Sequence, residues 1–263
     1  MRNVLARYKL PLASQLSRIN FSFMVIVCTV IAGCTSDTLP SELTQLYKQA
    51  NQLYENKEYL KAAENYEFIA SRVCNGNVYY NLGNTYFKLG QRGKAILYYE
   101  RAKRLMPRDK DIRRNLRFAI SLNEDKQFAP FSSILNSLIT INELIFLSFL
   151  FSCFFSAAAV VYILFDNAKI KKITRRAMSV IGGTLLLCLI ILILSVHTFS
   201  IPRAIVLIPE IVTKSAPDEG SAVLFSLHEG TMVEIKEMQG KWVKISLPDG
   251  TEGWVSSSAI GRI

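Results

Sequence analysis

The sequence predicts a multidomain membrane protein in which an all-α repeat domain, a two-helix transmembrane hairpin and an all-β barrel follow one another. Two apolar stretches, 144–165 and 177–199, contain no Asp, Glu, Lys or Arg. At a rise of about 1.5 Å per residue, each can cross a hydrocarbon core of about 30 Å, and it must do so as a helix because lipid offers the backbone no hydrogen bonds. Helical periodicity precedes them over 35–123, and short β-like runs follow over 204–263.

Residues 1–34 have the pattern of a bacterial signal peptide. A basic leader without acidic residues precedes the apolar run 21–32, which is too short for a comfortable membrane span but has the length of a signal core. The run ends in Ile31-Ala32-Gly33-Cys34, which resembles a lipobox, the motif whose cysteine thiol receives diacylglycerol. Three outcomes stay open: lipidation of Cys34, ordinary cleavage near Ala32, and an anchor that is not cleaved.

The loop 166–176 between the two spans predicts the orientation in the membrane. Its only acid is Asp166, and its cations are Lys169, Lys171, Lys172, Arg175 and Arg176. Short basic loops stay on the cytoplasmic side, so both flanks lie on the opposite side, which agrees with an export signal. We therefore expect a protein of the bacterial inner membrane with both soluble domains in the periplasm and a linker over 124–143 before the first span.

The composition excludes several classes of function. The net charge of +10 arises partly from the basic leader and the loop between the spans, and no basic segment carries a recognisable nucleic-acid reader, so we expect no nucleic-acid partner. Cys74 is the only cysteine outside the signal and the spans, which leaves no disulfide partner and no zinc-ligand spacing. We therefore expect neither a metal nor a cofactor.

A repeat with an offset of 33 residues organises the segment 41–123. Its second copy, 77–107, strongly resembles a tetratricopeptide repeat. The positions that carry this resemblance are Tyr79, Leu82, Gly83, Tyr86, Gly90, Ala95, Tyr99, Ala102 and Pro107. The first copy, 41–70, is a weaker match, and 111–123 is expected to form a capping helix. The resemblance implies an all-α tetratricopeptide-repeat domain over 35–123.

This resemblance also implies a ligand site on the first helix of each repeat, in the concave groove that holds an extended peptide. The Asn amides there could bond a peptide backbone, and the cations could favour an acidic segment. The candidate groove residues are Tyr47, Asn51, Tyr54, Tyr80, Asn84, Phe87, Lys88 and Arg114. Two plainer interpretations stay open: a solvated helix face, and docking against the chain's own membrane helices.

The segment 204–263 alternates β-like runs with turns. It closely resembles a bacterial SH3-type domain through the strings 227–233, 240–245 and 253–255, which implies an SH3-like barrel. Strand alternation places Trp242 and Trp254 on the face opposite the core residues that neighbour them. Both indoles would then form an exposed ledge for a peptide or glycan. The alternative is a satellite core in which they pack a loop onto the barrel.

The order of signal, tetratricopeptide repeats, membrane hairpin and SH3-type domain resembles the BatE proteins of bacterial aerotolerance (Bat) operons over essentially the full chain. This resemblance implies membrane partners among other Bat proteins, including those with von Willebrand A domains, and a link to a MoxR-type ATPase. It adds no catalytic residue.

The sequence favours a non-enzymatic scaffold that presents both domains for binding membrane or periplasmic proteins, or peptidoglycan. We do not expect an enzyme, because His197 ends a span, His228 lies in a barrel turn, and Cys74 lies on the helical flank, apart from both histidines, which argues against a Cys–His hydrolase. Two alternatives stay open: an accessory or targeting subunit of a cell-wall hydrolase system, and a membrane stress sensor.

Overall fold

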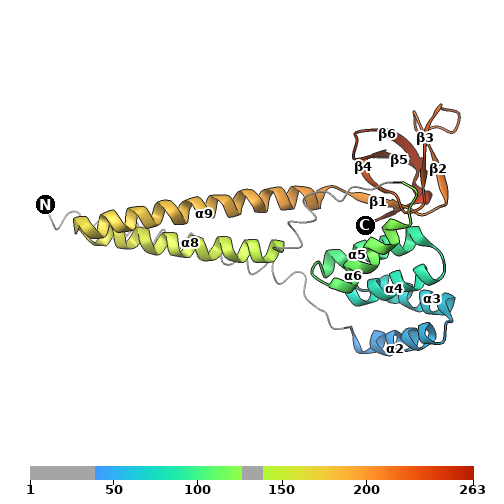
Figure 1. The fold of residues 1–263 in the computed structure, drawn as a ribbon, viewed down its shortest axis with the longest axis horizontal. Helices are drawn as coiled ribbons and strands as arrows, with labels where there is room; N and C mark the ends of the chain where they lie inside the picture. The colour runs from blue at the N-terminus through green and yellow to red at the C-terminus, as the bar shows by residue number, and fades with distance from the viewer. Residues whose placement is uncertain (1–38, 126–138) are drawn as a thin grey trace. The chain divides into compact units, whose positions relative to one another are not determined.

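The computed structural model describes residues 39–125 and 139–263, which belong to two compact units. One unit holds the two long apolar helices, and the other holds the helical repeat domain together with the barrel (Figure 1). The expected signal peptide over 1–34 with its Cys34, and most of the expected linker over 124–143, lie outside the described residues.

In the described part of the chain, five helices form the repeat domain. They are α2 (Ser41–Glu55), α3 (Tyr59–Ala70), α4 (Gly76–Lys88), α5 (Arg92–Leu105) and α6 (Lys110–Ser121). Each helix packs against the next one along the chain, which is the arrangement of two helical hairpins followed by a capping helix. The first copy of the sequence repeat, although the weaker match, therefore folds as a hairpin like the second.

Small residues allow the paired helices to approach closely. Gly83 of α4 faces the ring of Tyr99 on α5, and a β-carbon at Gly83 would lie 2.6 Å from that ring. Ala62 and Ala95, which are equivalent positions of the two repeats, are both fully buried. The side chain of Asn75 fixes the start of α4, because it accepts hydrogen bonds from the backbone N–H groups of residues 77 and 78.

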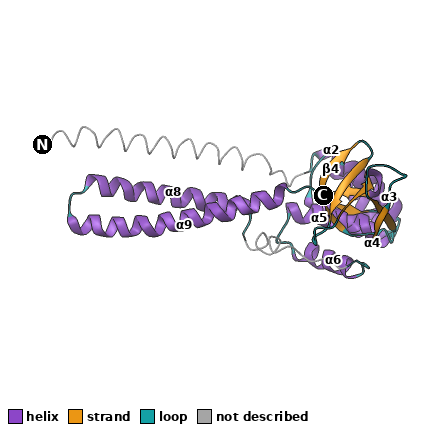
Figure 2. Ribbon diagram, turned by 90° about the horizontal axis from the view of Figure 1, so that it is seen from above, coloured by secondary structure: helices purple, strands orange, loops and turns teal. Residues whose placement is uncertain are grey.

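The other unit is a hairpin of two helices, α8 (Ile141–Leu164) and α9 (Ala168–Ser200), which lie side by side (Figure 2). Both are long and apolar enough to cross a membrane. A capping box begins α8: Thr140 Oγ1 accepts a hydrogen bond from the N–H of Glu143, and the Glu143 carboxylate accepts one from the N–H of Thr140.

The connection between α8 and α9 is shorter than the sequence predicts. The expected loop covers 166–176, but α9 already begins at Ala168, so the basic residues 169–176 form its first turns. No Gly or Pro interrupts this segment, and Lys, Arg and Ile are all compatible with a helix. Asn167 supports the helix start, since its Oδ1 accepts a hydrogen bond from the N–H of Lys169 at 2.9 Å.

The barrel is an antiparallel sheet of seven strands in the order β3-β2-β6-β5-β4-β1-β7. The strands are β1 (Arg203–Val206), β2 (Glu210–Lys214), β3 (Val223–His228), β4 (Met232–Gln239), β5 (Trp242–Ser246), β6 (Glu252–Ser256) and β7 (Ile260–Arg262). The sequence pattern does not predict β2 or β7. Strand β7 is too short for an alternation to be visible, and β2 mixes two aliphatic residues with Glu, Thr and Lys.

The apolar core of the repeat domain extends into the barrel, which also has a core of its own, and the sequence does not predict this contact. Helix α5 packs against β1 and β7. Ile205 of β1 is fully buried within the core of the repeat domain, where Leu207 and Ile263 also pack. We call this contact between α5 and the first and last strands of the barrel the seam.

Two glycines allow the backbones at the seam to come close together. A β-carbon at Gly93 would lie 2.5 Å from the carbonyl oxygen of Val206, and one at Gly261 would lie 2.5 Å from a methyl group of Leu97. The N–H of Gly93 also donates a hydrogen bond to Glu229 Oε1 at 2.8 Å.

Two arginines of α5 form hydrogen bonds with the C-terminal end of β7 and the residue that follows it. Arg101 donates to the carbonyl oxygen of Arg262 at 2.6 Å, and Arg104 donates to that of Ile263 at 2.8 Å. Hydrogen bonds from a charged group are stronger than neutral ones, so these two contacts help to fix how the C-terminal end of the barrel packs on α5.

Gly93→Ala is expected to destabilise the repeat domain and the barrel together. Its methyl group would overlap the Val206 carbonyl, and overpacking costs about 1–3 kcal/mol, against at most about 1 kcal/mol that Ala gains over Gly in a helix. Thermal unfolding of the full-length protein measures the loss. Gly183→Ala in α9 is the matched control, because no atom there lies within 4 Å of the added carbon. An unchanged Tm for Gly93→Ala would contradict a close-packed seam.

Candidate functional site

A groove of about 290 Å³ lies between the helices of the repeat domain. Its walls come from α2, α4, α5 and α6, and its lining residues are Tyr54, Asn84, Phe87, Lys88, Tyr99, Asn115 and Phe118. The first four of these are groove residues predicted from the sequence. Tyr99, Asn115 and Phe118 were not predicted.

A hydrogen-bond network fixes the Asn84 amide in the second repeat. Asn84 Oδ1 accepts two hydrogen bonds, from the hydroxyl of Tyr99 at 2.7 Å and from Asn115 Nδ2 at 3.0 Å. Asn115 Nδ2 also donates to the hydroxyl oxygen of Tyr80 at 3.1 Å. Three successive helices, α4, α5 and α6, are joined by these side chains.

The first repeat contains the same network one repeat earlier. Asn51 Oδ1 accepts hydrogen bonds from the hydroxyl of Tyr66 at 2.6 Å and from Asn81 Nδ2 at 3.1 Å. Asn81 Nδ2 also donates to the hydroxyl oxygen of Tyr47 at 2.8 Å. A sequence signal for these unpredicted partners exists, because Tyr66 recurs as Tyr99 at the offset of 33 residues, and Asn81 recurs as Asn115 at an offset of 34 residues.

These networks change what the two predicted amides can offer a ligand. The carbonyl oxygens of Asn51 and Asn84 are each occupied by two donors within the fold, while the Nδ2 group of Asn84 has no hydrogen-bond partner among the described residues. Burial raises the pKa of Tyr66 and of Tyr99, so both hydroxyls keep their protons and remain donors. The Asn84 amide therefore presents an N–H donor rather than a carbonyl acceptor.

The remaining predicted groove residues divide into two groups. Phe87 faces Phe118 with ring centres 5.7 Å apart, and together they give the groove an apolar wall. Lys88 is exposed at the groove and has no carboxylate partner in the described part of the chain. Arg114 is not among the lining residues, and its guanidinium pairs at the surface with Asp111 at 2.9 Å.

The predicted indole ledge of the barrel differs from the structure in one respect. Trp254 is opposite Lys244 in register, so it lies on the predicted outer face, but it is only 8% exposed. The reason is that β6 is an inner strand, and Lys214 of β2 flanks Trp254 on its other side. Trp242, at the start of β5, is half-buried. Of the two indoles, only that of Trp242 is therefore exposed enough to form part of a ligand-binding ledge on this face.

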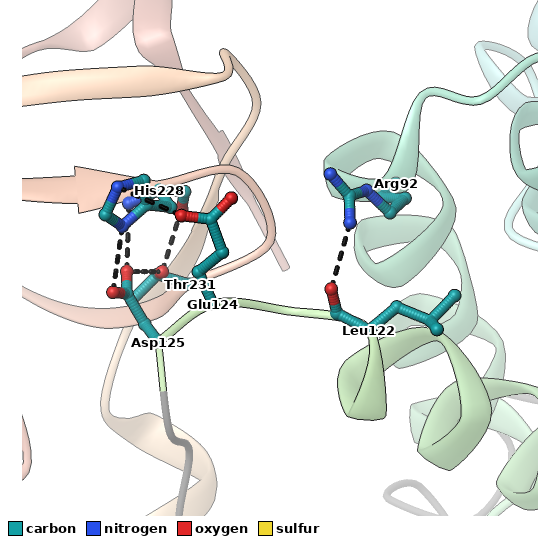
Figure 3. A network of polar contacts seen from close by, with 6 residues as sticks. All are labelled: Arg92, Leu122, Glu124, Asp125, His228 and Thr231. Atoms are coloured by element: carbon teal, nitrogen blue, oxygen red, sulfur yellow. Dashed lines mark hydrogen bonds and ion pairs between the residues drawn. The ribbon is translucent and has the colours of Figure 1, made fainter.

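A second polar cluster joins the segment after α6 to the barrel (Figure 3). Asp125 Oδ2 accepts hydrogen bonds from the backbone N–H of His228, at 2.9 Å, and from the hydroxyl of Thr231. Asp125 Oδ1 lies 3.0 Å from His228 Nδ1, and His228 Nε2 lies 3.4 Å from a carboxylate oxygen of Glu124. We call these four residues the latch cluster. The sequence predicts only a linker at 124 and 125.

The contacts within the latch cluster shift the pKa values of His228 and Asp125. A hydrogen bond to Asp125 raises the pKa of His228 above its ordinary value, and the charges of Glu124 and Glu210 act in the same direction. Partial burial acts to raise the pKa of Asp125, but the hydrogen bonds from Thr231 and His228 outweigh it, so the net shift is downward. Both shifts favour the charged pair.

Comparisons with protein families identify two parts of this architecture. The tetratricopeptide repeat model matches residues 76–109, and the bacterial SH3 domain model matches residues 214–261. No curated protein matches the chain. The first match covers α4 and α5 with most of the groove residues, whereas the second leaves out β1, which forms the seam. The chain thus contains a tetratricopeptide repeat and a bacterial SH3 domain.

Tyr99→Phe is expected to lower the free energy of unfolding of the repeat domain by about 0.5–1.5 kcal/mol, because Asn84 Oδ1 then loses one of its two donors. Tyr66→Phe should have a similar effect on the first network. Denaturant unfolding followed by circular dichroism measures both. Tyr59→Phe is the control, because the Tyr59 ring packs on Tyr54 but its hydroxyl makes no hydrogen bond with any described residue. Equal stability of the Tyr99 and Tyr59 variants would contradict the network.

Proposed function

We propose that the protein is a non-enzymatic scaffold of the bacterial inner membrane that binds an extended peptide segment of a partner protein in its groove. The helices α8 and α9 anchor it in this proposal, and the repeat domain and barrel face the periplasm. Tetratricopeptide repeats and bacterial SH3 domains both suggest protein–protein binding, and the latter also suggests cell-wall binding.

The groove is the observation that carries this proposal, because its lining matches the chemistry of a peptide. The Nδ2 group of Asn84, which lines the groove, can donate to a main-chain carbonyl oxygen. Phe87 and Phe118 supply an apolar wall for a side chain, and the unpaired Lys88 favours a carboxylate nearby. The best ligand is therefore an extended segment that combines an apolar residue with an acidic one.

The seam supports the membrane-hairpin topology. The repeat domain precedes α8 in the chain and the barrel follows α9, yet the two domains pack into one unit. If α8 and α9 cross a membrane, both flanks must therefore lie on the same side of it. This is the arrangement that an even number of spans produces, and the basic residues between α8 and α9 favour a cytoplasmic connection.

The surroundings of His228 favour a structural role over catalysis. Both ring nitrogens face carboxylates, so neither is free to activate a nucleophile. The described residues contain no group of His, Cys, Asp and Glu side chains that could hold a metal ion. Membership of a Bat-type complex linked to stress tolerance is a further part of the proposal, supported by the domain order, with von Willebrand A domain proteins as expected partners. Peptidoglycan is the expected second ligand, on the Trp242 face.

In-cell photocrosslinking tests the groove. A photoreactive phenylalanine analogue at Phe118 is expected to capture a partner, and the same analogue at Phe68, an exposed position of α3 outside the groove, is expected not to. Lys88→Glu should abolish capture at Phe118, whereas Lys48→Glu on the exposed face of α2 should not. No capture at Phe118, or equal capture at both phenylalanines, would contradict groove binding.

Site-specific labelling tests the topology. In a variant with Cys74→Ser, a cysteine introduced at Lys57 or at Ser221 should add reaction with a membrane-impermeant maleimide in intact spheroplasts, relative to Cys74→Ser alone, because both domains are proposed to be exported. A cysteine at Lys171, in the basic first turns of α9, should react only after the membrane is opened. Labelling of Lys171 alone in intact cells would overturn the proposed orientation.

A further inference from the structure

The latch cluster involves the segment that follows α6 in the chain. Asp125 is the last residue that the structure describes in this segment, and β1, which begins at Arg203, directly follows α9. Asp125 bonds to the barrel, and β1 packs on α5 of the repeat domain. Both segments therefore take part in contacts between the repeat domain and the barrel.

We propose that the latch cluster is a proton-sensitive latch, which holds the repeat domain to the barrel while His228 is protonated and loosens when His228 loses its proton. The ligand is the proton itself, and the switching group is an imidazole placed between carboxylates. Histidine is the side chain whose ordinary titration lies closest to neutral pH.

The geometry explains why the charge of His228 matters. A protonated imidazole donates from both ring nitrogens, so Nδ1 can bond Asp125 Oδ1 while Nε2 pairs with Glu124. A neutral imidazole keeps a proton on only one nitrogen. If Nδ1 keeps it, the lone pair of Nε2 faces the Glu124 carboxylate, and that contact changes from attractive to repulsive.

The other charged groups around His228 reinforce this dependence. Glu210 is paired with His228 in register between β2 and β3. A pocket beside the latch cluster is lined by Arg92, Asn123, Glu124, Pro209, His228 and Glu229. Apart from His228 itself, Arg92 is the only basic residue among the described residues that line this pocket, and its guanidinium donates to the carbonyl oxygen of Leu122 at 2.9 Å (Figure 3). Acidic groups thus outnumber basic ones around the imidazole.

The signs of the two pKa shifts define the pH range of the closed latch. The pKa of His228 is raised above 6.5, so its contribution is complete below that pH and is lost as the pH rises through the raised value. The pKa of Asp125 is lowered below 3.8, so its contribution is complete above that pH and is lost as the pH falls through the lowered value. The latch is therefore strongest in mildly acidic solution.

An unfavourable contact beside the latch cluster helps the latch to open. The amide nitrogen and oxygen of Asn123 are buried beside Gly230 and have no hydrogen-bond partner among the described residues. A buried polar group without a partner regains hydrogen bonds when water reaches it. Weakening the neighbouring His228 contacts therefore acts on a part of the interface that already gains by becoming hydrated.

Hydrogen exchange of the full-length protein in detergent, followed by mass spectrometry, reads the latch directly. The backbone N–H of His228 donates to Asp125, and that of Gly93 donates to Glu229, so both amides report on the contact between the domains. After correction for intrinsic exchange, their protection should be highest in mildly acidic solution and should fall as the pH rises through the pKa of His228. A pKa of His228 that is higher by 1 corresponds to about a tenfold larger fall in protection over this pH range.

Two variants separate the latch from general stability. His228→Gln keeps a neutral donor, so it should fold but lose the pH dependence of protection. Asp125→Asn should lower protection at every pH. Glu252→Gln, which removes a surface carboxylate paired with Lys244 on the barrel, is the matched control and should keep the wild-type profile.

Protection at His228 and Gly93 that is independent of pH in the wild type would overturn the proposal, as would a pH dependence that persists in His228→Gln. The effect on the membrane connections rests on the proposed anchoring by α8 and α9. The exchange measurement reports only on the soluble unit. It can therefore contradict the latch without contradicting groove binding or the membrane topology, and the tests of those two proposals can fail without contradicting the latch.

Discussion

The packing of α5 against the first and last strands of the barrel is the contact on which the rest of the soluble unit depends. About three tetratricopeptide repeats are normally needed for a stable stack, and this chain has two hairpins and a capping helix. The barrel covers a face of α5 that would otherwise be exposed at the side of a short stack. Ile205 of the barrel belongs to the core of the repeat domain, so the barrel provides part of what further repeats would provide.

The two faces of α5 show how one helix serves both the seam and the groove. Gly93, Leu97, Arg101 and Arg104 recur at helical spacing and all contact the barrel. Tyr99 lies between them in sequence but on another face, where its hydroxyl holds the Asn84 amide at the groove. The groove and the seam thus involve different faces of a single helix.

The sequence predicts much of the fold because its signals are local. Spacing within each repeat predicts the hairpins, the lack of charge predicts α8 and α9, and strand alternation predicts the outer face for both tryptophans. The seam could not be predicted, because it joins residues as distant in the chain as Leu97 and Gly261, and each of them is also plausible within a separate domain.

The candidate site was predictable in position but less so in chemistry. The recurrence of Asn51 as Asn84 indicates which amides matter, yet only the positions of Tyr66, Tyr99, Asn81 and Asn115 show that their carbonyl oxygens are already occupied. Alternation groups Trp254 with the outer face of the barrel but does not predict its burial, since the pattern within β6 does not reveal that β2 and β5 flank this strand on both sides.

The most direct test of a single soluble unit is whether the repeat domain and the barrel unfold together. Both tryptophans of the chain lie in the barrel, so indole fluorescence follows the barrel, while circular dichroism follows the loss of helix in the repeat domain. Both signals should be recorded on one sample of the full-length protein in detergent during denaturant unfolding. Coincident midpoints are predicted, because the burial of Ile205 in the core of the repeat domain couples the unfolding of the two domains. Two transitions, with the fluorescence change separated from the loss of helix, would contradict this coupling.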